Sequence, residues 1–327
     1  MTRRYVAGAK ENLVGSRDGE SMTNERVARR AAVPHAGSVL TSRDNRWLKE
    51  FRVALRGGVA TASGAVGVEG VRLVEEALSS GCRVEAVLFS DSGERYREKL
   101  APYVNKSEMG FPVLQTTDRL FEGIADTERP QGVAALVVPK SAELVDVLAT
   151  PEEACAPLVV VLAGVQDPGN VGTIVRTAAA FGATGVVTSA TGQSGTASPF
   201  APKALRASAG AALHLPVLMG MALGILLTQL KMNGVRTVAS CVHGEGAGLV
   251  APWEVKWCEP VALLVGNEGA GLPEDVVHAA DARIHIPMAT LPSSGETKVE
   301  SLNAGAAAAV VMYEAFRQRT RKLAVDS

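Results

Sequence analysis

The sequence predicts an α/β protein in which a small N-terminal α/β domain precedes a larger C-terminal domain with a mostly parallel sheet. Three observations support this prediction. Short apolar runs alternate with helical patterns along most of the chain, which is typical of parallel sheets covered by helices. Residues 157–163 are apolar throughout, as expected for a strand buried on both faces. Ser141 to Pro157 contains two prolines and several acids, and it separates the two parts.

The N-terminal part begins with a segment that shows no apolar periodicity. Residues 1–41 are rich in Arg, Ala, Gly and Ser, so we expect a flexible basic arm. A basic helix is expected from Ser42, because Trp47, Leu48, Phe51 and Leu55 fall on one stripe. Further helices are predicted at 69–80, 94–104 and 118–124, and strands at 83–90, 112–115 and 132–138. These elements form a predicted domain over residues 42–140, followed by a linker over 141–156 with a short helical piece at 142–148.

The C-terminal domain is predicted over residues 157–322. Its strands are expected at 157–163, 185–189, 237–242, 261–265 and 283–287, and its helices at 171–181, 221–232, 273–280 and 302–319. Residues 213–230 are apolar enough to resemble a membrane span, but they include His214, Pro216 and Gln229. We interpret this stretch as buried core. Ligands of parallel sheets bind at the carboxyl ends of the strands, so the loops there should carry the chemistry.

Composition and charge narrow the possible functions. The chain has 327 residues, of which 47% are hydrophobic and 20% charged, which fits a globular protein and excludes a disordered or collagen-like chain. Its four cysteines form no C-x-x-C pair, so we expect neither structural zinc nor a disulfide framework, and a reducing cytoplasm is the expected compartment.

Basic residues are unevenly placed along the chain. Residues 1–56 hold 12 Lys and Arg against 6 Asp and Glu, and residues 168–244 contain no Asp or Glu at all. A locally cationic surface favours phosphate backbones and makes their binding salt-dependent. The alternative is that acids are missing from 168–244 because much of that stretch is core.

Three loops that follow predicted strands carry polar residues. The first, Asp167-Pro-Gly-Asn-Val-Gly-Thr-Ile-Val-Arg176, offers Asn170 as the cap of a helix beginning at Val171, with Arg176 about a turn and a half later. The second, Gly266-Asn-Glu-Gly-Ala-Gly271, leaves backbone N–H groups exposed for a flat ligand or a carboxylate, and Glu268 is its single acid. Its spacing matches neither a dinucleotide fingerprint nor a P-loop.

The third loop runs from Ile286-Pro-Met288 to Ser301-Leu-Asn303, where an Ala-rich helix begins that Ser301 is expected to cap. Each of these loops also has a simpler interpretation. Asn170 is then only a cap, Arg176 a solvated side chain and Glu268 the surface residue of a tight turn.

In this order the three segments resemble the SpoU/TrmH family of SPOUT RNA methyltransferases, which transfer a methyl group from S-adenosylmethionine to a ribose 2′-oxygen. The resemblance covers residues 157–319, and residues 42–140, with Val68-Glu-Gly-Val-Arg-Leu-Val74, resemble the L30-like substrate-binding domain of many members. It implies a trefoil knot in the C-terminal domain, S-adenosylmethionine as cofactor, no metal, and a homodimer formed through the knot domain. A partner subunit is expected to complete each site.

The resemblance also assigns roles to individual residues. The implied catalytic residues are Asn170, Arg176, Glu268, Ser301 and Asn303. The implied cofactor-binding residues are Gly266, Asn267, Gly269, Ile286, Met288 and Leu302, and the expected RNA-binding residues are Lys203 and Arg206. A guanidinium has a pKa above about 12 and is a poor base, so we assign Arg176 to phosphate binding and hydroxyl orientation, with Glu268 paired to it. Residues 289–300 depart from the family's shorter link and form a long loop that we expect near the cofactor.

We therefore expect a cytoplasmic, S-adenosylmethionine-dependent RNA methyltransferase that modifies a ribose 2′-hydroxyl and has no membrane partner. Ribosomal RNA is preferred over tRNA because the N-terminal domain resembles a ribosomal protein. Two alternatives stay open: a tRNA 2′-O-methyltransferase, and a non-catalytic knot-fold protein that binds RNA or assists ribosome assembly. A Rossmann-type dehydrogenase is disfavoured because its glycine fingerprint is missing. The histidines are scattered, and His243 is the one we consider for the pocket.

Overall fold

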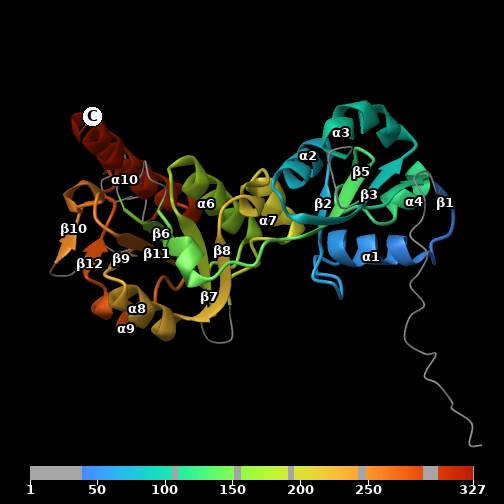
Figure 1. Cartoon of the computed structure of the whole chain (residues 1–327). Coiled ribbons are helices and arrows are strands. Elements are labelled where there is room, and N and C mark those ends of the chain that lie inside the picture. The colour runs from blue at the N-terminus through green and yellow to red at the C-terminus, as the bar shows by residue number, and fades with distance from the viewer. Residues whose placement is uncertain are drawn as a thin grey trace, which may run out of the picture. The chain divides into compact units, whose positions relative to one another are not determined.

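A computed structural model describes residues 39–104, 110–150, 156–190, 195–241, 248–289 and 301–326, which form two sheets (Figure 1). Within these residues the strand order is β1-β4-β3-β5-β2 in the N-terminal sheet and β10-β12-β9-β11-β6-β7-β8 in the C-terminal sheet. Most of the predicted arm over 1–41, the candidate His243, and residues 290–300 of the long loop lie outside the described residues.

The N-terminal sheet is mixed. Its strands are β1 (Val39–Leu40), β2 (Val66–Glu69), β3 (Arg83–Ser90), β4 (Val113–Thr116) and β5 (Val133–Val138). β5 runs antiparallel to β2 and β3, whereas the β1–β4 and β3–β4 pairs are parallel. Two helices lie on one face and two on the other (Figure 1): α1 (Arg46–Leu55) and α4 (Asp118–Glu122) oppose α2 (Val71–Ser79) and α3 (Arg97–Val104), which follows the short 3-10 helix Ser92–Tyr96.

The helix predicted after Ser42 is confirmed as α1. The side chain of Asn45 accepts a hydrogen bond from the Trp47 N–H at 2.9 Å and caps the helix. Leu48, Phe51 and Leu55 are fully buried. The next helix begins at Val71 rather than at residue 69, because the chain up to Glu69 pairs as β2 and Gly70, with φ of +94°, turns it from strand to helix.

The C-terminal sheet is parallel in every strand pairing of the described residues, as predicted. Its strands are β6 (Leu158–Ala163), β7 (Gly185–Ala190), β8 (Val217–Ala222), β9 (Arg236–Ser240), β10 (Leu249–Val250), β11 (Val261–Gly266) and β12 (Ala282–Ile284). β6 and β11 are neighbours in the middle of the sheet, and every residue of both is buried. This explains the uninterrupted apolar run of 157–163.

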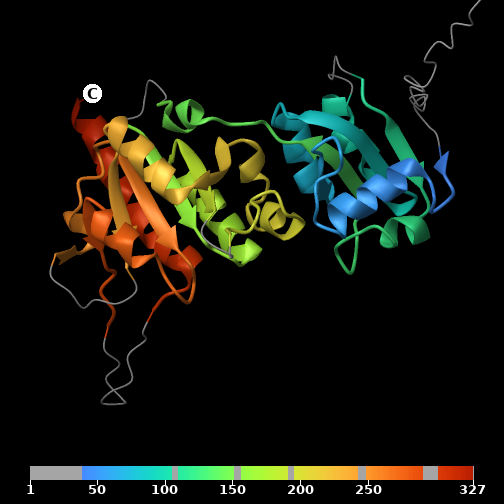
Figure 2. The same ribbon diagram turned by 90° about the horizontal axis from the view of Figure 1, so that it is seen from below.

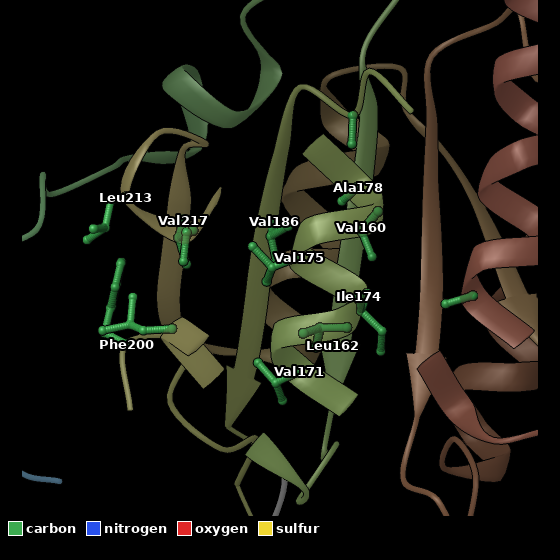
Figure 3. Close-up of a cluster of buried hydrophobic side chains, with 14 of the residues drawn as sticks. Val160, Leu162, Val171, Ile174, Val175, Ala178, Val186, Phe200, Leu213 and Val217 are labelled. Carbon is green, nitrogen blue, oxygen red and sulfur yellow. The ribbon is translucent and has the colours of Figure 1, made fainter. Parts of the chain in front are cut away.

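Helices cover both faces of the C-terminal sheet. Val160 and Leu162 of β6 pack in one core cluster with α6 (Pro168–Ala180) and α10 (Ala304–Asp326), as the stick side chains of α6, β6 and β7 show in Figure 3. Val159 and Val161 pack in another cluster, with α5 (Leu144–Leu148), α8 (Leu223–Met232) and α9 (Glu274–Ala279). The remaining short helices are α7 (Pro202–Ala207), Ala211–Leu213 and Pro252–Glu254.

The prediction that residues 213–230 are buried core is wrong for part of the stretch. Residues 217–222 form β8, which lies at an edge of the sheet and, among the described residues, pairs only with β7. Met219 is 50% exposed, and Ile225 of α8 is 59% exposed. In the described part of the chain, no helix is both long and apolar enough to cross a membrane.

Candidate active site

The loops after β6 and β11 lie side by side because their strands are paired. The two strands are parallel, with Ala163 opposite Gly266 at their carboxyl ends. The chain that follows Ala163 leads into α6, and the chain that follows Gly266 forms the glycine-rich turn. Two of the three polar loops therefore meet at one edge of the sheet, as the position of the motifs predicts.

Glu268 links the two loops. Its carboxylate accepts hydrogen bonds from the backbone N–H of Gln166 and of Asp167, both at 3.1 Å, and from Nδ2 of Asn170 at 3.0 Å. Burial raises the pKa of Glu268, but the hydrogen bonds from Asn170, Gln166 and Asp167 outweigh it, so its pKa lies below the ordinary glutamate value. Glu268 is therefore ionised at neutral pH and is a weak base.

The third loop joins this cluster through two asparagines. Oδ1 of Asn170 accepts a hydrogen bond from Nδ2 of Asn303 at 2.9 Å, and Oδ1 of Asn303 accepts from the N–H of Gly305, also at 2.9 Å. The orientation of both amides is set by these partners, since Asn170 donates to a carboxylate and Asn303 accepts from a helix N-terminus. Glu268, Asn170 and Asn303 thus form one directional chain of hydrogen bonds.

Two of the predicted helix caps are wrong. α6 begins at Pro168, and Asp167 caps it by accepting from the N–H of Gly169, so Asn170 lies inside the first turn. In α10 the capping side chain is Asn303 rather than Ser301. In both helices the capping oxygen comes from the residue directly before the first helical residue. In α6 this leaves the Asn170 side chain available to contact Glu268.

The glycine-rich turn is closed by Asn267. Its Oδ1 accepts from the N–H groups of Gly269 and Ala270, both at 2.9 Å, and its Nδ2 donates to the carbonyl of Gly164 at 2.9 Å. The N–H of Gly269, predicted to bind the cofactor, is therefore used inside the turn. Internal hydrogen bonds thus define the shape of the turn.

The close packing of backbone against Gly266 can be tested by substitution. A Cβ at residue 266 would lie 2.3 Å from the carbonyl carbon of Gly271. A Cβ at residue 269 would meet only Asn267 Oδ1 among the described residues, at 3.6 Å. We expect Gly266→Ala to lower the free energy of unfolding by about 1–3 kcal/mol because backbone must move. Urea unfolding with Gly269→Ala as the matched control checks this, and equal stabilities of the two variants would contradict it.

A cavity of about 740 Å³, including its open mouth, lies beside the polar cluster. Most of the predicted cofactor-binding residues line it, together with two of the predicted catalytic residues: Gly266, Asn267, Ile286, Met288, Leu302, Glu268 and Ser301. The largely apolar lining with a few polar groups is typical of a small-molecule site. Neither Ser301 nor Leu302 is buried, so this part of the lining is open to solvent.

Three polar residues of the cavity were not predicted: Ser240, Cys241 and His285. Ser240 ends β9, Cys241 follows it, and His285 follows β12. The rule that ligands bind at the carboxyl ends of strands could therefore have identified them. Nδ1 of His285 is buried and has no hydrogen-bond partner in the described residues. Burial raises the pKa of the Cys241 thiol, while Arg283 acts in the opposite direction. Cys241 is therefore a neutral thiol and not a nucleophile at neutral pH.

Arg176 does not join the cluster. Its side chain is exposed on α6, and within the described residues it forms no hydrogen bond or ion pair. The predicted pairing of Glu268 with Arg176 is wrong within one chain, because the Glu268 carboxylate is occupied by N–H donors from the neighbouring loop and Asn170.

The two predicted RNA-binding residues are both ion-paired. Lys203 lies 2.8 Å from Asp167, and Arg206 lies 2.7 Å from Asp126. Hydrogen bonds from Lys203 and Gly169 hold the pKa of Asp167 below its ordinary value. Acids from outside the acid-free segment 168–244 therefore offset these cations, and the segment is less cationic in the fold than in the sequence. In the part of the chain that is described, no group of three or more His, Cys, Asp or Glu residues is placed to hold a metal ion.

Two family models match this chain. Residues 157–313 match the SpoU rRNA Methylase family, and residues 61–135 match the MRM3-like substrate binding domain. Among curated proteins, the 23S rRNA (guanosine(2553)-2′-O)-methyltransferase RlmP of Bacillus subtilis (strain 168) is 32% identical over 277 residues, which cover 84% of this chain and 97% of that protein.

Solved structures of methyltransferases are also similar to this chain. The SpoU methyltransferase AviRb from Streptomyces viridochromogenes has a TM-score of 0.68 and 26% identity, covering 85% of this chain and 99% of that one. An AdoMet-bound rRNA methyltransferase from Sinorhizobium meliloti has a TM-score of 0.69 and 28% identity, covering 86% and 97%.

Proposed function

This chain belongs to the SpoU rRNA methylase family and is an S-adenosylmethionine-dependent RNA methyltransferase, and we propose that it methylates a ribose 2′-hydroxyl of ribosomal RNA. The observation that supports the proposal is the hydrogen-bonded chain Glu268–Asn170–Asn303 at the edge of the cavity. Ribosomal RNA is favoured over tRNA because the Bacillus subtilis relative is named as a 23S rRNA 2′-O-methyltransferase.

The chemistry of the cavity's lining suits the methyl donor. Its apolar side chains, which include Ile284, Ile286 and Leu302, suit an adenine ring, and the buried Nδ1 of His285, which has no partner among the described residues, can bond to a polar ligand atom. Gly266, Asn267 and Met288 would hold the donor from the other loops. Bound there, S-adenosylmethionine supplies a methyl group already activated by its sulfonium.

The chain's own residues then have to place a hydroxyl oxygen. Each of the Asn170 and Asn303 amides keeps one N–H that is not used in the hydrogen-bonded chain, and these N–H groups can orient the ribose. Glu268 holds Asn170 in that orientation and is too weak a base to remove a ribose proton beforehand. We infer that the site works by aligning the ribose oxygen in line with the methyl group. The oxygen–carbon bond would form as the donor's sulfur–carbon bond breaks, which leaves a neutral thioether, and the hydroxyl proton would pass to water.

We further propose that the enzyme is a homodimer in which Arg176 serves the partner subunit's site. Arg176 is exposed on α6, the helix that ends near an apolar face shared with α10. On that face Tyr313 and Phe316 are 55% and 38% exposed, and both rings contact Phe181 at centroid distances of 5.7 and 5.6 Å. Exposed aromatic side chains grouped in this way are typical of an interface.

The two domains predicted from the sequence have different proposed roles. We propose that residues 42–140 select the RNA and residues 157–322 transfer the methyl group, with 141–156 as a linker whose helix α5 packs on the C-terminal sheet. The ranges of the two family matches support this division.

Transfer of labelled methyl groups tests the substrate. The protein is incubated with labelled S-adenosylmethionine and, in separate reactions, with unmodified ribosomal RNA or tRNA from cells that lack the enzyme. We expect label in ribosomal RNA. Label in tRNA alone would replace the proposed substrate, and donor binding without transfer to either RNA would favour the non-catalytic alternative.

A further inference from the structure

We propose that the solvent face of α1 binds the phosphate backbone of the RNA substrate. The inference rests on the proposed function and deepens it, because it names the surface that holds the RNA. α1 spans Arg46–Leu55 and precedes residues 61–135, the range that matches the substrate-binding family model, so that match gives it no role.

Basic side chains occupy the side of α1 that is turned away from the sheet. Seen from below, α1 lies in front of the strands of the N-terminal sheet (Figure 2), against which it buries Leu48, Phe51 and Leu55. Its other side carries a row of basic residues at helical spacing, with one more in the turn before the helix: Arg43, Arg46, Lys49, Arg52 and Arg56. All are exposed except Arg52, which is half-buried. Residues 46 to 56 span about 15 Å along the axis, so the row can contact several phosphates of one strand.

Few acids offset this row. Glu50 lies 3.3 Å from Arg46, and Asp44 lies 3.1 Å from Lys49; three of these four side chains are more than half exposed. Exposed pairs of this kind contribute little and exchange readily for another anion. No carboxylate in the described part of the chain pairs with Arg52 or Arg56. These arginines are therefore available to a ligand.

The opposite face of the same sheet has a different charge pattern. α2 exposes Arg72 but also carries Glu75 and Glu76, and Glu75 pairs with Lys99 of α3 at 2.6 Å. The cationic row is thus confined to one face, which is what a surface for a polyanion requires.

Trp47 adds a contact suited to RNA rather than to another polyanion. It is half-buried beside the row, with the Arg46 guanidinium 5.9 Å from its ring centroid. An unpaired base can stack on such an aromatic and arginine pair. Insertion of α1 into a lipid bilayer is disfavoured because its large apolar side chains are already buried in the core of the sheet.

The test compares two double variants of the full-length protein. Arg52→Gln/Arg56→Gln removes two cations of the α1 row, and Arg72→Gln/Arg95→Gln removes two exposed arginines from α2 and from Ser92–Tyr96. Glutamine has nearly the helix propensity of arginine, so both variants should fold. Binding of a fluorescein-labelled hairpin RNA with an unpaired loop is measured by anisotropy at several NaCl concentrations, and binding of S-adenosylmethionine by calorimetry.

We expect the α1 variant to bind the hairpin about tenfold more weakly at low salt and to lose about 1.5 from the slope of log affinity against log salt. The control variant should match wild type in both, and both variants should bind S-adenosylmethionine normally. Wild-type affinity in the α1 variant, or equal losses in the two variants, would overturn this inference and leave the proposed function intact. A wild-type protein that neither binds the hairpin nor methylates RNA would overturn both.

Discussion

The Glu268→Gln variant is expected to transfer methyl groups about 100-fold more slowly than wild type while still binding S-adenosylmethionine. The wild-type carboxylate accepts from Gln166 N–H on one oxygen and from Asp167 N–H and Asn170 Nδ2 on the other. A glutamine presents an NH2 group to one of these donors in either orientation. Turning it to satisfy Gln166 makes its NH2 face Asn170, whose amide must then flip and give up its bond to Asn303.

Glu274→Gln is the matched control for this variant. Glu274 is an exposed acid in the first turn of α9, a few residues beyond the glycine-rich turn, and no hydrogen bond or ion pair of its side chain is found among the described residues. Single-turnover rates and calorimetric affinities for the donor are measured for both variants. A Glu268→Gln enzyme with the wild-type rate would show that the Glu268–Asn170–Asn303 chain does not position the reacting hydroxyl.

The second large effect is expected from mixed dimers. Arg176→Ala and Glu268→Gln homodimers should both be nearly inactive, with rates reduced about 100-fold or more. A heterodimer with one subunit of each kind contains one site that combines Glu268 from one subunit with Arg176 from the other. If Arg176 acts on the partner subunit, that heterodimer should recover about half of the wild-type rate, because one of its two sites is intact.

Co-expression with two different affinity tags isolates the heterodimer. The two mutant homodimers, purified with the same tags, are the controls for activity. A heterodimer as inactive as the homodimers would place Arg176 and Glu268 in the same subunit's site. A protein that sediments as a monomer would refute the proposed dimer itself.

The elements with two buried faces or a clear apolar stripe were predictable from the sequence. β6 and β11 have uninterrupted apolar runs because helices cover both sides of the sheet, and α1 shows its buried stripe directly. β8 could not be predicted in the same way, because an edge strand with Met219 half exposed has the composition of a core segment without its burial.

The site was predictable as a set of loops but not as a set of contacts. The pairing of β6 with β11 brings Glu268 and Asn170 together. The sequence predicts only that both loops lie at the carboxyl ends of their strands. Which side chain caps a helix depends on the residue at which the helix begins. α6 begins at Pro168, so Asp167 caps it and Asn170 does not. The acid that pairs with Arg206, Asp126, is distant in the sequence, so a linear count of charge overestimates the local potential.

Mass spectrometry of nucleosides tests the central claim most directly. Ribosomal RNA methylated by the purified enzyme is digested to nucleosides, and the added methyl group is located on the ribose or on the base. We predict a 2′-O-methylated nucleoside that wild type forms and Glu268→Gln forms about 100-fold more slowly. A methyl group on a base, or equal amounts of the ribose-methylated product from both proteins, would contradict the assignment of the Glu268–Asn170–Asn303 chain to ribose methylation.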